Sequence, residues 1–154
     1  MRRKQKPILK MIVFISILIL FCLLLYVIFS QSAKDRATSL VDDFYQYEKS
    51  GNFGGSWILF HPLMKKKFSQ DDYIQKRAHV FMQDFGVKTF SYTVGKAKHL
   101  KSWRFSKESP KLKNVYQVPI TQTFKSTFGN FTIHQNVYVA ENKDKWTILW
   151  SYEK

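Results

Sequence analysis

Hydrophobic residues follow three successive patterns along this chain: a continuous apolar run, then helical spacing, then alternation. Residues 11–29 read MIVFISILILFCLLLYVIF and contain no charged side chain. Because a helix rises about 1.5 Å per residue, this run is long enough to cross a hydrocarbon core of about 30 Å. The pattern predicts a transmembrane helix over residues 11–30, preceded by a short tail at residues 1–10.

Beyond the apolar run, helical spacing predicts two further helices with a short helical piece between them. Residues 33–50 place apolar side chains on one side and charged side chains on the other. Residues 56–68 predict one or two helical turns. The third helix spans residues 69–86, with Ser69 as its N-cap and Gly86 as its end.

After Gly86 the hydrophobic period changes to two, which predicts strands. The first strand continues into the second after an irregularity at Gly95, and a hairpin turn is expected at Gly129-Asn130. The predicted strands cover residues 89–94, 98–104, 115–128, 130–139 and 146–152. Helices that precede an antiparallel meander indicate the α+β class, with about three helices on one face of a curved sheet of about four strands.

The last predicted strand has the clearest alternation in the chain. Trp146, Ile148 and Trp150 leave one face of the sheet, and we expect the helices to cover that face. These three residues are therefore the predicted core signature. Leu149 leaves the opposite face, where we expect solvent or a partner.

Charge next to the apolar run predicts its orientation. Five basic residues and no acid precede the run, whereas Lys34 and Arg36 follow it together with Asp35. The positive-inside rule therefore places the N-terminus in the cytoplasm and residues 31–154 outside the cell membrane as one domain. The length of the run favours an anchor that is retained, and cleavage near Ala33 is the alternative.

The single cysteine and the distribution of lysine limit the chemistry of the external region. Cys22 lies in the apolar run, so residues 31–154 contain no thiol for a disulfide or a thiolate metal site. The chain carries a net charge of +14. A basic segment is a candidate anion-facing surface for anionic lipid or a wall polymer, and its location disfavours nucleic acid. Its residues are Lys88, Lys96, Lys98, Lys101, Arg104, Lys107, Lys111, Lys113 and Lys125.

Several short motifs in residues 33–152 occur in an order that resembles a known family. They are Asp35-Arg36, Ser69-Gln70-Asp71-Asp72-Tyr73, Gly86-Val87-Lys88, Asn114-Val115-Tyr116-Gln117-Val118 and Trp146-Thr147-Ile148-Leu149-Trp150. The set resembles the N-terminal extension of the low-affinity, methicillin-resistance-type class B penicillin-binding proteins of Gram-positive bacteria. The resemblance implies the cone-shaped fold of nuclear transport factor two and a spacer or docking role, with no catalytic residue and no cofactor. Ser151 departs from the family, which has an acidic residue after the closing Trp-x-Ile-x-Trp pattern.

These observations lead to one main hypothesis and two alternatives. The main one is a non-enzymatic, membrane-anchored domain that binds or positions a protein partner in Gram-positive cell-envelope assembly. The first alternative is an assembly component of a conjugation or type IV secretion channel, which shares the layout of tail, span and cone-shaped domain. The second is a cone-cavity ligand binder or enzyme, with Asp42, Asp43, His79 or Asp84 as candidate acid–base groups. The four histidines show no metal-binding spacing.

Overall fold

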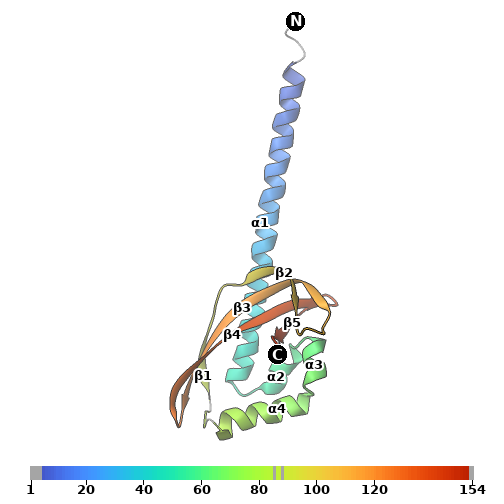
Figure 1. Ribbon diagram of the computed structural model, residues 1–154. Helices are drawn as coiled ribbons and strands as arrows, with labels where there is room; N and C mark the ends of the chain where they lie inside the picture. Colours follow the sequence, from blue (N-terminus) through green and yellow to red (C-terminus); the bar gives the residue numbers. More distant parts are fainter. Residues whose placement is uncertain (1–4, 85, 88, 153–154) are drawn as a thin grey trace. The chain divides into compact units, whose positions relative to one another are not determined.

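A computed structural model describes residues 5–84, 86–87 and 89–152, and it divides the chain into two compact units, Met1–Ala33 and Lys34–Lys154. The first helix, α1 (Gln5–Lys49), belongs to both units (Figure 1). The helical segments predicted at residues 11–30 and 33–50 both lie in this helix, and no proline or glycine interrupts residues 30–33. The side chains of residues 9–29 are exposed, and the helix is long and apolar enough to cross a membrane.

Three short helices and one π-helix follow α1 in the second unit. They are α2 (Phe53–Ile58), α3 (Pro62–Lys67), α4 (Gln70–Ala78) and the π-helix η1 (His79–Asp84). The predicted cap is confirmed, since the Ser69 hydroxyl accepts a hydrogen bond of 3.2 Å from the Asp72 amide. The predicted third helix is α-helical as far as Ala78, and His79–Asp84 have π geometry.

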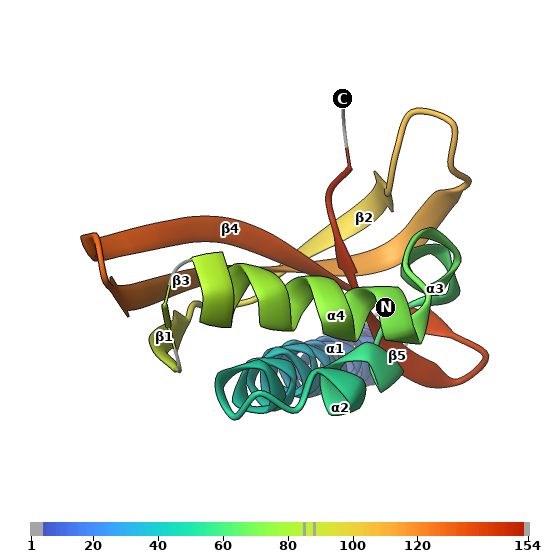
Figure 2. The ribbon, with the colours of Figure 1, turned by 90° about the horizontal axis from the view of Figure 1, so that it is seen from below.

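The α+β class is confirmed, and the sheet contains five antiparallel strands rather than about four. The strands are β1 (Phe90–Val94), β2 (Lys98–Arg104), β3 (Lys111–Ser126), β4 (Gly129–Asn142) and β5 (Lys145–Trp150). Both β1 and β2 pair with β3, which then pairs with β4, and β4 pairs with β5. The long strands β3 and β4 bend around the helices (Figures 1 and 2).

The irregularity predicted at Gly95 is a bulge that separates β1 from β2. Val94 pairs with Ile120 and Lys98 pairs with Gln117. The three residues 95–97 therefore lie opposite only two residues of β3, 118 and 119. The Gly95 amide donates to the Pro119 carbonyl at 2.8 Å, and a Cβ at Gly95 would lie 2.6 Å from the Pro119 ring. Close approach of the two strands therefore requires glycine here.

One face of the sheet packs on the helices. Directly paired residues of antiparallel strands leave the same face, which places Val137, Val139, Ile148 and Trp150 together. The Trp150 ring lies 5.8 Å from that of Phe44 on α1. Phe60, between α2 and α3, and Tyr73 on α4 add rings 5.1 and 6.1 Å from Trp150. Ile148 is fully buried, whereas Trp146 and Trp150 are partly buried against this core.

The opposite face of β5 is also buried, so the predicted exposure of Leu149 is wrong. Leu149 is 0% exposed and pairs with Tyr138. The Trp103 ring of β2 stacks on the Tyr138 ring at 4.0 Å. The segment after β2 also reaches the end of β5, because the Phe105 carbonyl accepts a hydrogen bond of 3.1 Å from the Tyr152 amide. The β2–β3 hairpin thus covers the face that alternation alone assigned to solvent.

Candidate functional site

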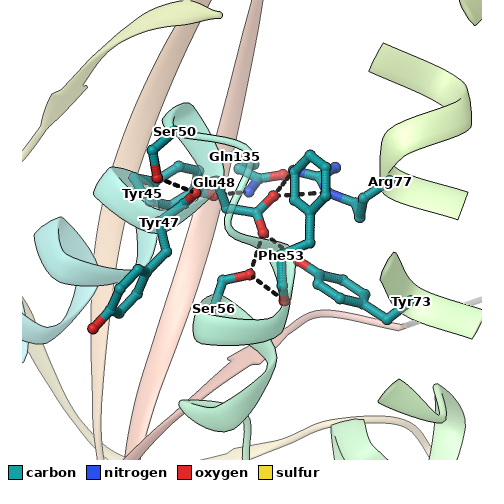
Figure 3. A network of polar contacts seen from close by, with 9 residues as sticks. All are labelled: Tyr45, Tyr47, Glu48, Ser50, Phe53, Ser56, Tyr73, Arg77 and Gln135. Atoms are coloured by element: carbon teal, nitrogen blue, oxygen red, sulfur yellow. Dashed lines mark hydrogen bonds and ion pairs between the residues drawn. The ribbon is translucent and has the colours of Figure 1, made fainter. Parts of the chain in front are cut away.

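A buried carboxylate forms the most densely connected polar group among the described residues. Glu48, near the end of α1, is 2% exposed. Its Oε1 accepts hydrogen bonds from the Ser56 hydroxyl and, at 2.7 Å, from the Tyr73 hydroxyl. Its Oε2 accepts from Arg77, at 2.7 Å from Nε and also from Nη2 (Figure 3). This Glu48 cluster joins α1, α2 and α4.

The ionisation of the neighbouring groups follows from their burial and from the Glu48–Arg77 pair. Burial, the Glu48 charge and the Glu48 hydrogen bond together raise the pKa of Tyr73 well above its usual value, so its hydroxyl stays protonated. Burial lowers the pKa of Arg77, but the Glu48 charge and the hydrogen bonds outweigh it, and the net pKa is raised. The cluster therefore combines the Glu48–Arg77 ion pair with a neutral phenol, Tyr73, that donates to the same carboxylate.

A second set of polar side chains lies on the helix-covered face of the sheet. The Gln135 amide donates to the hydroxyl of Tyr45, which is fully buried on α1. Burial raises the pKa of Tyr45, and so this phenol is also neutral. Gln122 is 4% exposed, and its Nε2 has no hydrogen-bond partner; the Nε1 of Trp150 is likewise buried without one. The interior of the domain is therefore polar in places, although aromatic rings fill most of it.

The four acid–base candidates from the sequence do not come together. Asp42 accepts a hydrogen bond of 2.8 Å from the Tyr92 hydroxyl, and Asp43 is exposed on α1. His79 and Asp84 are both exposed, and the His79 Nε2 lies 3.5 Å from the Asp84 Oδ1 across η1. None of these four residues contacts the Glu48 cluster through a described hydrogen bond. The described residues contain no group of three His, Cys, Asp or Glu side chains that could hold a metal ion.

The predicted basic surface is divided between two parts of the domain. Lys98, Lys101 and Arg104 are exposed on β2, and Lys111 and Lys113 are exposed on β3. Lys96 is exposed in the bulge and Lys107 in the connecting loop. Lys125 is exposed near the far end of β3, and Lys88 lies outside the described residues.

Sequence reasoning missed Glu48 as a functional or structural centre. It lies four residues after Phe44 and seven after Val41, which places it on the apolar stripe of α1. A carboxylate on a stripe that faces the core requires a buried partner. That signal was present in the sequence, but the identity of the partner depended on where α4 would lie.

The chain matches no family model and no curated protein. The fold and the site are therefore interpreted from their own geometry.

Proposed function

We propose that this protein is a membrane-anchored, non-enzymatic domain that binds or positions a protein partner in Gram-positive cell-envelope assembly. The observation that carries the proposal is the direct connection of one apolar, span-length helix to one α+β domain. The process, cell-envelope assembly, is proposed because the ordered motifs resemble the penicillin-binding-protein extension. In that family the corresponding region is a spacer or docking domain.

The proposed orientation places the N-terminus in the cytoplasm and residues 31–154 outside the membrane. Five basic residues precede the apolar run and two follow it before residue 37. Basic residues on the cytoplasmic side favour this topology by the positive-inside rule.

The proposal of a non-enzymatic role rests on how the buried charges are used. Both oxygens of Glu48 are occupied: Oε1 accepts hydrogen bonds from Ser56 and Tyr73, and Oε2 accepts from Arg77. A carboxylate held in this way is poorly placed to exchange a proton with a substrate. Three segments of the domain meet at this pair, which favours a structural function for it.

The partner would meet exposed apolar side chains on the domain. Phe128, in the turn between β3 and β4, is 86% exposed, and Ile58 at the end of α2 is 63% exposed. Large apolar side chains with this exposure are candidate anchors for a protein interface.

A photo-crosslinking amino acid in place of Phe128 or Ile58, incorporated in living cells, tests this function. Capture of a peptidoglycan-synthesis protein from either position, and not from position 66 on the exposed face of α3, supports the proposal. Capture of conjugation-channel components would overturn it in favour of the secretion alternative. Absence of any crosslink at both positions, with normal protein levels, would count against a partner on these surfaces.

A further inference from the structure

The folded unit carries a concentration of basic side chains at the end where α1 enters it. Lys34 begins this unit, and Arg36 lies over the Trp146 ring at 5.3 Å. Trp146 contacts Tyr116 at 5.3 Å, and Tyr116 contacts His99 of β2 at 5.1 Å. These contacts bring α1, β5, β3 and β2 together at one end of the unit.

We name this end the helix-entry face and define it by its charged side chains. Its basic residues come from α1, from β2 and the bulge before it, from the β4–β5 turn and from the start of β5. They are Lys34, Arg36, Lys96, Lys98, Lys101, Lys143 and Lys145. The acidic residues in the same segments are Asp35, Glu141 and Asp144. Six of the seven basic side chains are exposed, and Lys34 is partly exposed. The face therefore has an excess of positive charge that is directed into solvent.

One positive charge of this face, that of Lys145, also acts on a lysine just outside the face. Burial lowers the pKa of Lys65 on α3, and the charge of Lys145 lowers it further. Clustered cations without enough neighbouring anions favour an external anion.

Chain connectivity keeps Lys34, the first residue of the helix-entry face, close to the end of the apolar run. Phe29 ends that run, and Lys34 follows five residues later. Five residues reach at most about 18 Å even when fully extended. If residues 11–29 span a membrane, the first residue of the folded unit stays within that distance of the membrane surface whatever the link's conformation.

We propose that the helix-entry face binds the anionic phospholipid headgroups of the membrane in which the chain is anchored. Lysine and arginine supply the charge, and Trp146 and Tyr116 are of the residue types enriched at membrane interfaces. The inference rests on the proposed membrane anchorage. It adds that the domain is held against the bilayer, which would fix the direction in which the opposite end, with Phe128, meets a partner.

The opposite end of the same unit provides a matched control surface. Thr89 Oγ1 donates to the Lys49 carbonyl at the end of α1, and Phe90 pairs with Phe124 near the far end of β3. Lys49 and Lys125 are exposed at this end, and Figure 1 shows it away from β2. Reversing two charges here changes the net charge equally without changing the helix-entry face.

Energy transfer from the domain to the lipid surface tests the proposal in the full chain. The chain carries Cys22→Ser and either Asn142→Cys or Phe128→Cys for a donor dye, and is reconstituted in vesicles whose headgroups carry the acceptor. Vesicles of phosphatidylcholine are compared with vesicles that also contain phosphatidylglycerol. We expect transfer from position 142 to increase with phosphatidylglycerol, and transfer from position 128 to remain low in both.

Charge reversal and salt give the decisive comparison. Each lysine near an anionic surface changes the binding constant about fivefold. The double variant Lys98→Glu with Lys143→Glu should therefore lower the equilibrium constant for binding of the face to the headgroups at least about 25-fold. Lys49→Glu with Lys125→Glu should leave it unchanged. Salt should remove the effect as the Debye length falls from about 8 Å at 0.15 M to about 3 Å at 1 M.

Three results would overturn the proposal, and each has a different meaning. A chain that resists alkaline extraction but shows no dependence on phosphatidylglycerol refutes the lipid surface and leaves the anchorage intact. Release by alkaline extraction refutes the anchorage, and with it both proposals. If the donor signal at position 142 changes only when soluble poly(glycerol phosphate) is added, and not with anionic lipid, the face binds a wall polymer instead.

Discussion

Around β5 both faces of the sheet are buried, but they are covered by different parts of the chain, whereas the outer face farther along β3 and β4 is exposed at Thr132, His134 and Asn136. Helices α1, α2 and α4 cover the face of Trp150, where the Glu48 ion pair crosses between them. On the other face, Trp103 of the β2–β3 hairpin stacks on Tyr138 beside Leu149. The contacts among the helices include buried charge, whereas the hairpin covers its face largely with apolar and aromatic groups.

The helices on one face and the hairpin on the other meet different physical requirements. The face covered by separate helices needs contacts that hold those helices together. The Glu48–Arg77 pair, in which two guanidinium nitrogens donate to one carboxylate oxygen, provides a directional link between α1 and α4. A cover made by a neighbouring hairpin is already joined to the sheet through β3. It needs only rings that fill the space beside the sheet. Asn114, whose φ is 52°, departs from extended geometry in the part of β3 that pairs with β2.

The largest expected effect is at the helix-covered face. Replacing Glu48 by Gln removes the carboxylate that neutralises Arg77, and breaking a buried pair in this way costs about 3–5 kcal/mol. We expect urea unfolding of residues 31–154 to show a loss of this size. Asp43→Asn, an exposed carboxylate on the same helix, should change stability by less than about 0.5 kcal/mol. Equal effects of the two changes would contradict a special role for the buried pair.

The next comparison is between neighbouring residues that leave opposite faces of β5. Trp150→Ala should cost about 3–5 kcal/mol and Leu149→Ala about 2–5 kcal/mol, because both leave cavities in packed regions. Thermal melting of the two variants measures this. A loss below about 1 kcal/mol for Leu149→Ala would mean that the hairpin does not cover this face in solution.

A double-mutant cycle can separate the two faces. Trp103→Ala should destabilise by about 1–3 kcal/mol, since it removes a stacked ring from a partly buried site. Combined with Leu149→Ala it should be non-additive by about 0.5 kcal/mol or more, whereas combined with Glu48→Gln it should be additive. Equal coupling to both residues would argue against two independently covered faces.

The smallest expected effect concerns pH at the cap of α3. Burial lowers the pKa of His61 below its usual value of 6.5, and its Nδ1 accepts a hydrogen bond of 3.1 Å from the Leu63 amide. The unfolded chain therefore binds a proton more readily, and stability should decrease as pH falls through about 6.5. The decrease should be about 1 kcal/mol or less.

His61→Asn is the matched variant for this measurement, because asparagine can cap the helix without titrating in this range. Its unfolding free energy between pH 7.5 and pH 5.5 should change less than that of the parent chain. An unchanged pH dependence would assign the effect to other groups.

Local patterns predicted much of the fold. The Ser69 cap, the irregularity at Gly95 and the period-two strands were all visible because each depends on residues that are close together in the chain. The helical segments predicted at residues 11–30 and 33–50 both lie in α1, but helical spacing alone did not show that they join into one helix. Of the site, the sequence supplied the basic residues but not the Glu48–Arg77 pair, whose members are 29 residues apart.

The sequence by itself determined that this chain has an apolar helix of span length, an α+β domain without a thiol, and an excess of positive charge. These properties follow from composition and short-range periodicity. Only the tertiary structure decided that Leu149 is buried, that Glu48 meets Arg77, and that Arg36 lies beside Trp146 at the helix-entry face. The reason is that sheet alternation specifies a side, whereas coverage of that side depends on how the whole chain bends and packs.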